Sequence, residues 1–161
     1  MLEVTMKNFL RNSITLIIVS PMMILVFISS IFLGKAGAIR LWGPLLTVFT
    51  KLSLKILVPK INSASEFDQF KTRLKSRFWL WRPFFTLSVA EENKDRIQLK
   101  IDNCPFCEVF QAAGLQGMAP YICNADWKLA QESRDKWGFE RNREIGRGDS
   151  FCNTAYTRIE E

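Results

Sequence analysis

The chain has 161 residues, 22 lysines and arginines against 16 aspartates and glutamates, a formal net charge of +6, four cysteines and no histidine. This length suits one domain with an anchor, and the lack of histidine excludes Ser-His-Asp and Cys-His catalytic pairs, His-ligated zinc and His-ligated haem. The basic residues are spread along the chain without a groove-reading motif, so we expect no nucleic acid as a partner.

The first predicted element is an uncharged apolar segment over residues 13–33. At about 1.5 Å per residue, a helix of this length crosses a hydrocarbon core of ~30 Å. We therefore predict an N-terminal tail over residues 1–12 and a transmembrane helix over residues 13–34, with the lipid bilayer as a partner. A cleaved signal peptide is the alternative, because Ala36-Gly37-Ala38 resembles a cleavage site, although the apolar run exceeds the ~7–15 residues of an h-region.

The charges that flank this segment predict its orientation. Lys7 and Arg11 precede it and are offset by Glu3, whereas the basic residues that follow it are more numerous. The positive-inside rule then gives a single-pass membrane protein with its C-terminal domain in the cytoplasm, where cysteines stay reduced. The basic residues after the segment are Lys35, Arg40, Lys51, Lys55 and Lys60.

Residues 35–61 are predicted to form an amphipathic interfacial helix and a linker. Apolar side chains recur at helical spacing over residues 41–56, while Thr47, Lys51 and Lys55 fall on the other side. Such a helix lies in the membrane interface, with Trp42 at the level of the headgroups, or packs on the rest of the protein. The sequence leaves both arrangements open.

Residues 62–161 are predicted to form a cysteine-containing α+β domain. A helix is expected over residues 63–79, because Ser63 followed by Glu66 is typical of a capping box. Extended segments are expected over residues 84–90 and 96–101, and the second alternates apolar and polar side chains, as a half-buried antiparallel strand does.

The rest of the domain is predicted as two helices and two strands. The helices cover residues 105–113 and 124–133, and the strands cover residues 139–145 and 151–158. A hairpin turn at Gly146-Arg147-Gly148-Asp149 joins the strands. The predicted fold class is therefore α+β: an N-terminal transmembrane helix plus a small antiparallel sheet with helices packed on one face.

Cys104 is the best nucleophile candidate among the side chains. It precedes Pro105, which suits the first position of a helix, and a helix N-terminus favours the thiolate. An inert buried cysteine is the alternative. Cys104-Pro105-Phe106-Cys107 also matches the dithiol motif of glutaredoxin-like thiol-disulfide oxidoreductases. However, a thioredoxin-type fold has a fully buried parallel strand before this motif, and the strand here alternates.

The four cysteines are also candidate ligands for zinc or an iron–sulfur cluster. Only Cys104 and Cys107 form a close pair, while Cys123 and Cys152 stand alone, whereas structural zinc sites usually have two paired knuckles. Asp126 is a conceivable extra ligand. The sequence requires no cofactor.

The segment from Asn103 to the C-terminus resembles the L-2-amino-thiazoline-4-carboxylic acid hydrolase family, over about residues 97–158. In that family the named activity opens a cyclic amidine, a thiazoline ring, by adding water. The resemblance implies a pocket in which a cysteine thiolate attacks the amidine carbon and Asp126 moves protons and activates water. Cys104, Cys123, Asp126 and Cys152 would surround that pocket. The resemblance is carried by Cys104-Pro105, Gly114, Cys123 with Asp126, Arg141, Ile145, and Gly148-Asp149 with Cys152.

Two functional hypotheses from different classes follow. One is a membrane-anchored C–N hydrolase that acts on a cyclic amidine. The other is a non-catalytic accessory subunit of a membrane complex, or a homo-oligomer, whose cysteine cluster is structural or binds metal. A thiol-disulfide oxidoreductase is a third and weaker interpretation.

Overall fold

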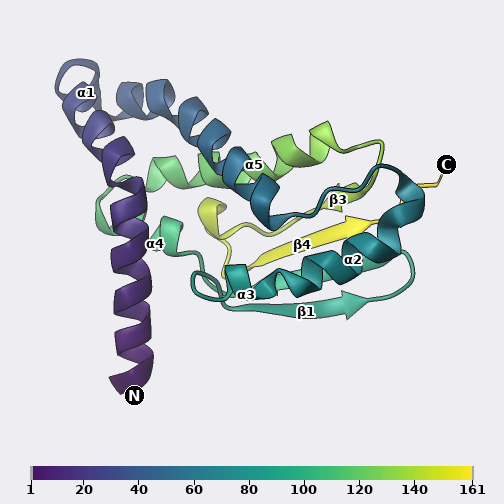
Figure 1. Ribbon diagram of the computed structural model, residues 1–161. Helices are drawn as coiled ribbons and strands as arrows, with labels where there is room; N and C mark the ends of the chain where they lie inside the picture. The colour runs from purple at the N-terminus through teal and green to yellow at the C-terminus, as the bar shows by residue number, and fades with distance from the viewer. Residues whose placement is uncertain (1, 161) are drawn as a thin grey trace.

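The computed structural model describes residues 2–160, and side chains from residue 8 onward. Its first helix, α1 (Leu2–Leu57), is a hairpin of two helical arms, residues 2–33 and 35–57, which meet at Gly34 (φ 67°, ψ 163°). Glycine adopts this positive φ without a Cβ clash, so the chain can reverse there. Figure 1 shows the second arm folding back toward the rest of the protein. The predicted transmembrane and amphipathic helices are therefore joined, and helix also covers most of the predicted tail.

The first arm of α1 has one buried face and a wide exposed apolar face. Thr15, Val19, Met23 and Val26 are buried at helical spacing against the rest of the protein. Within residues 2–160, α1 is long and apolar enough to cross a membrane by length and composition. The exposed apolar side chains of the two arms are Phe9, Leu10, Ile14, Leu16, Ile17, Ile18, Ile24, Leu25, Phe27, Ile28, Ile31, Phe32, Leu33, Leu41, Leu45, Val48, Phe49, Leu52 and Ile56.

The helix predicted over residues 63–79 is present but broken. It consists of a 3₁₀ turn, η1 (Ala64–Glu66), then α2 (Phe67–Ser76) and α3 (Phe78–Trp81), with the break at Arg77. The strands β1 (Leu87–Glu92) and β2 (Arg96–Ile101) follow, close to the predicted positions.

The C-terminal elements differ from the prediction in their bounds. After α4 (Pro105–Ala112) comes η2 (Gln116–Met118), and α5 (Ala119–Glu132) begins earlier than predicted because Pro120 occupies its first turn. The strand predicted over residues 139–145 is only β3 (Gly138–Glu140), since the chain then leaves the sheet at Arg141. A 3₁₀ turn, η3 (Ile145–Arg147), replaces the predicted simple hairpin turn before β4 (Cys152–Thr157).

The strands form a four-stranded antiparallel sheet in the order β1-β2-β4-β3. Leu99 pairs with Thr154 and Ile101 with Cys152, and all four side chains are buried on one face. Helix α2 packs on this face through Phe67 and Phe70, and α5 packs there as well. Figure 1 shows α2 crossing the sheet beside these strands. The predicted α+β class, with its small antiparallel sheet, is confirmed.

The hairpin α1 belongs to both parts of the core. Leu54 and Val58, near the end of its second arm, lie in the cluster beneath the sheet. Val19 and Leu46 lie in a second cluster with Phe110 and Met118, which come from α4 and η2. Burial of such side chains is the main source of folding free energy, so α1 stabilises the C-terminal region as well as lying beside it.

Candidate functional site

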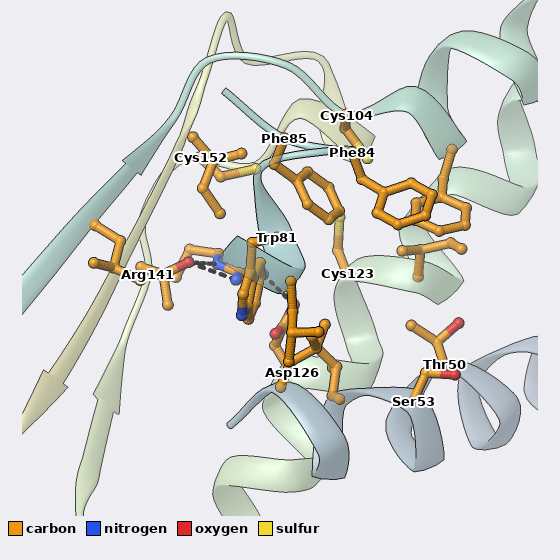
Figure 2. A pocket seen from close by; sticks show the side chains of 18 of the residues that line it. Thr50, Ser53, Trp81, Phe84, Phe85, Cys104, Cys123, Asp126, Arg141 and Cys152 are labelled. Carbon is orange, nitrogen blue, oxygen red and sulfur yellow. Dashed lines mark hydrogen bonds and ion pairs between the residues drawn. The ribbon is translucent and has the colours of Figure 1, made fainter. Parts of the chain in front are cut away.

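A cavity of about 270 Å³ lies between the α1 hairpin, α3, the sheet and the start of α5 (Figure 2). Cys104, Cys123, Asp126 and Cys152 all line it, although they come from the start of α4, from α5 and from β4. Cys107 is not among the lining residues. The rest of the wall is mainly apolar and is made by Ile18, Val19, Leu46, Phe49, Thr50, Ser53, Leu54, Leu57, Leu80, Trp81, Phe84, Phe85, Leu99, Ile101, Phe106, Ile122, Arg141, Thr154 and Tyr156.

Cys104 occupies the N-cap position of α4. Its backbone is extended, its carbonyl accepts a hydrogen bond from the Glu108 N–H at 3.0 Å, and Pro105 begins the helix. A hydrogen bond from the Cys107 thiol lowers the pKa of Cys104, although burial acts in the opposite direction. The same hydrogen bond, together with burial, raises the pKa of Cys107. Within this pair, ionisation is therefore favoured at Cys104, and Cys107 is the donor.

The other two thiols of the cavity are held neutral. Burial raises the pKa of Cys123 to about 12, and nearby Arg141 only partly opposes this. Burial also raises the pKa of Cys152, even though the Ile145 N–H donates to its Sγ at 3.2 Å. Only Cys104 therefore combines a lowered thiol pKa with a place on the cavity wall.

Asp126 is fixed by a buried ion pair. Arg141 Nη1 donates to Asp126 Oδ2 at 2.9 Å, and the side chains are only 4% and 15% exposed. Arg141 also donates to Thr154 Oγ1 from Nε at 3.1 Å and from Nη2 at 2.6 Å. Burial disfavours the guanidinium charge, but the Asp126 carboxylate together with the nearby Cys152 and Cys123 outweighs this effect and raises the pKa of Arg141. The pair thus places a carboxylate in a largely apolar cavity.

Among the lining residues that were not predicted as site residues, Arg141, Thr154 and Trp81 bear on the chemistry of the cavity. Arg141 is one of the residues that carry the family resemblance, so the sequence contained a signal from which its place in the site could have been predicted. Thr154 had no signal, because its role depends on the pairing of β4 with β2. Trp81 had none either, since it ends an aromatic-rich segment with no motif. In Figure 2 the Trp81 indole lies among Arg141, Asp126 and Cys123.

The alternative roles of the cysteines receive little support from the geometry. All four cysteines are free thiols. Within the described part of the chain, no three Cys, Asp or Glu side chains converge as ligands for one metal ion. The strand before the Cys104–Cys107 motif, β2, is antiparallel to both of its neighbours, unlike the parallel strand of a thioredoxin-type site.

Comparison with known proteins gives one match. The family model described as L-2-amino-thiazoline-4-carboxylic acid hydrolase matches residues 53–156, from the end of α1 to β4. This range is more than half of the chain and includes every polar side chain of the cavity except Thr50. Searches of curated proteins and of solved structures found no match.

Proposed function

Since the chain belongs to the L-2-amino-thiazoline-4-carboxylic acid hydrolase family, we propose that it is a membrane-bound hydrolase that opens a cyclic amidine. The observation that supports the proposal is that Cys104, at the N-cap of α4, and Cys123 and Asp126, three residues apart on α5, all line one cavity. A nucleophile, a neutral thiol and a carboxylate within one partly apolar enclosure suit acid–base and covalent chemistry.

In the proposed reaction, the Cys104 thiolate adds to the amidine carbon, and the electrons of the C=N bond move to nitrogen. The tetrahedral centre then collapses, and one ring heteroatom leaves and takes a proton. Asp126 accepts a proton from water, which attacks the same carbon and releases the Cys104 thiolate. The net change is the addition of one water molecule, with no change in oxidation state.

The membrane part of the proposal is supported by the exposed apolar face of α1 and by its contacts. Arg11 Nη2 donates to Glu108 Oε2 at 2.6 Å, and Asn12 donates to the same atom at 3.0 Å. A crossing by residues 13–34 would therefore carry α4 and η2 to membrane depth. Residues 104–123 suit such a place, because their single charge is the paired Glu108. Because the second arm of α1 folds back toward the sheet, the single-pass orientation expected from the flanking charges does not follow from this fold.

A turnover assay tests the enzymatic part. The full chain in mild detergent should hydrolyse 2-amino-thiazoline-4-carboxylic acid, with product detected by mass spectrometry. Cys104→Ala should abolish turnover, whereas Cys107→Ala should retain the nucleophile and keep part of the activity. Equal activity of wild type and Cys104→Ala would exclude covalent catalysis by Cys104, and a folded but inactive wild type would count against the hydrolase.

The accessory-subunit hypothesis is favoured by one observation, the breadth of the exposed apolar face on both arms of α1. Helices of other membrane subunits would cover such a face as well as lipid would. Migration of the protein at a defined larger mass in gently solubilised native membranes, unchanged by Cys104→Ala and without turnover, would favour this function over hydrolysis.

A further inference from the structure

The cavity has two chemically different ends. On the side of the sheet and α5, its wall carries Cys104, Cys123 and the Asp126–Arg141 pair. On the side of α1, the wall is formed mainly by apolar side chains such as Val19 and Leu46, with Thr50 and Ser53 as the polar side chains among them. A molecule that fills this space must be polar at one end and apolar at the other.

Trp81 supplies an unused donor inside the cavity. Its side chain is 5% exposed, and within residues 2–160 its Nε1 is buried without a hydrogen-bond partner. An unpaired buried N–H is costly, and buried Trp usually donates to a partner. Because Trp81 lines the same cavity as Cys104 and Asp126, a molecule bound there with an acceptor atom in its polar part would supply the missing partner.

The apolar end of the cavity reaches the outer face of α1. Ile18 and Phe49 line the cavity, one from each arm, and both are also exposed, at 41% and 55%. They belong to the same apolar face that we propose to lie in lipid. The cavity wall at Ile18 and Phe49 therefore borders the face of α1 that we propose to lie in lipid.

We propose that the substrate is an amphiphile drawn from the membrane, a cyclic amidine that carries an alkyl chain. Its ring lies against Cys104 and accepts a hydrogen bond from Trp81 Nε1, and its chain leaves between Ile18 and Phe49. At ~30 Å³ for each water-sized group, 270 Å³ holds about nine such groups, which suits a substituted five-membered ring without a long chain. This inference rests on the proposed function in treating the bound molecule as a substrate and the exposed face of α1 as lying in lipid.

A matched pair of probes tests the inference. The full chain in detergent is titrated calorimetrically with 2-amino-thiazoline and with 2-amino-4-octyl-thiazoline, and turnover of each is measured in parallel. Burial of even a few methylenes is expected to make the octyl probe bind at least ~10-fold more tightly. Trp81→Phe should weaken both probes roughly fivefold, since it removes one hydrogen bond.

Variants on the outer face of α1 distinguish binding of the octyl chain at the cavity from its uptake by the detergent micelle. Phe49 and Leu52 are both 55% exposed, but only Phe49 lines the cavity. Phe49→Asn should therefore weaken the octyl probe alone, and Leu52→Asn should leave both probes unchanged.

The outcomes of these experiments separate the amphiphilic substrate from the hydrolase activity. Equal binding of the two probes, or an equal loss in Phe49→Asn and Leu52→Asn, would overturn the amphiphile while turnover still supported a hydrolase. Octyl binding that depends on Trp81 and Phe49 without turnover would support the amphiphilic site and reject the hydrolase. Binding of neither probe by the folded protein would overturn the inference.

Discussion

At the scale of single residues, the contact between Cys107 and Cys104 determines which thiol is reactive. The Cys107 donor lowers the pKa of Cys104, so Cys107→Ala should raise that pKa. Since only the thiolate is nucleophilic, the midpoint of Cys104 alkylation by iodoacetamide should move to higher pH, and the rate near neutral pH should fall. Peptide mass spectrometry measures this rate residue by residue. Cys152→Ala is the control, because it leaves the donor in place, and an unchanged midpoint in Cys107→Ala would refute the role of the donor.

The Asp126–Arg141 pair makes a second prediction at this scale. Asp126→Ala leaves the guanidinium buried without its partner, which typically costs about 3–5 kcal/mol of unfolding free energy. Asp126→Ala combined with Arg141→Met removes both charges and should recover part of that loss. Unfolding in guanidinium, followed by tryptophan fluorescence in detergent, gives the comparison. If the double variant were less stable than either single variant, the pair would not be the source of the loss.

The residues of the site could be predicted in part. Cys104 follows from local chemistry, because the N-cap position and Pro105 are visible in the sequence. From the residues alone, Cys123, Asp126 and Cys152 were candidate metal ligands; only the family resemblance predicted a catalytic pocket that they share with Cys104, and all four line one cavity. Trp81 could not be predicted, since its place on the cavity depends on α3 and the sheet meeting, which no local pattern encodes.

At the scale of elements, the close packing of the second arm of α1 on α5 depends on Gly43. A Cβ at Gly43 would lie 2.4 Å from ring atoms of Tyr121, so Gly43→Ala should cost about 1–3 kcal/mol of unfolding free energy through overpacking. In a Tyr121→Ala background the clash is absent, and the same change should stabilise by up to ~1 kcal/mol, as alanine does in a helix. Thermal unfolding of the wild type, the two single variants and the double variant measures this change of sign. If Gly43→Ala were stabilising in both backgrounds, the contact of Gly43 with Tyr121 would be unimportant for stability.

The elements show where sequence periodicity is reliable. β2 was predicted at its observed bounds because alternation of Ile97 and Leu99 with polar residues reflects one buried face. The strand predicted over residues 139–145 was too long, because Arg141 turns inward to Asp126, a partner on another element. The only sign in the sequence of the break of α1 at Gly34 was the glycine itself. The second arm folds back because of contacts with α5, such as the hydrogen bond that Thr47 Oγ1 donates to the Tyr121 carbonyl at 2.8 Å.

At the scale of the whole molecule, α1 is both the proposed membrane segment and part of the core. The family match begins at residue 53, just before Leu54, which packs beneath the sheet. The first arm reaches the same body through the Arg11–Glu108 ion pair and through Val19. The predicted boundary between an anchor and a domain at residues 61 and 62 is therefore crossed by buried contacts, which a sequence window does not show.

This packing predicts the fate of the fragment 62–161. Removing residues 1–61 strips Leu54 and Val58 from the main cluster and exposes Phe110 and Met118, which α1 covers in the intact chain. An apolar patch of this kind drives association, so the fragment should sediment in detergent-free buffer and lack a cooperative thermal transition. A chain without residues 1–9, which keeps Arg11 and the buried Thr15, Val19, Met23 and Val26, should fold as the full chain does in detergent. A soluble, monomeric fragment with a sharp transition would instead make α1 an independent anchor, and the cavity would then lose the wall through which we propose that its substrate enters.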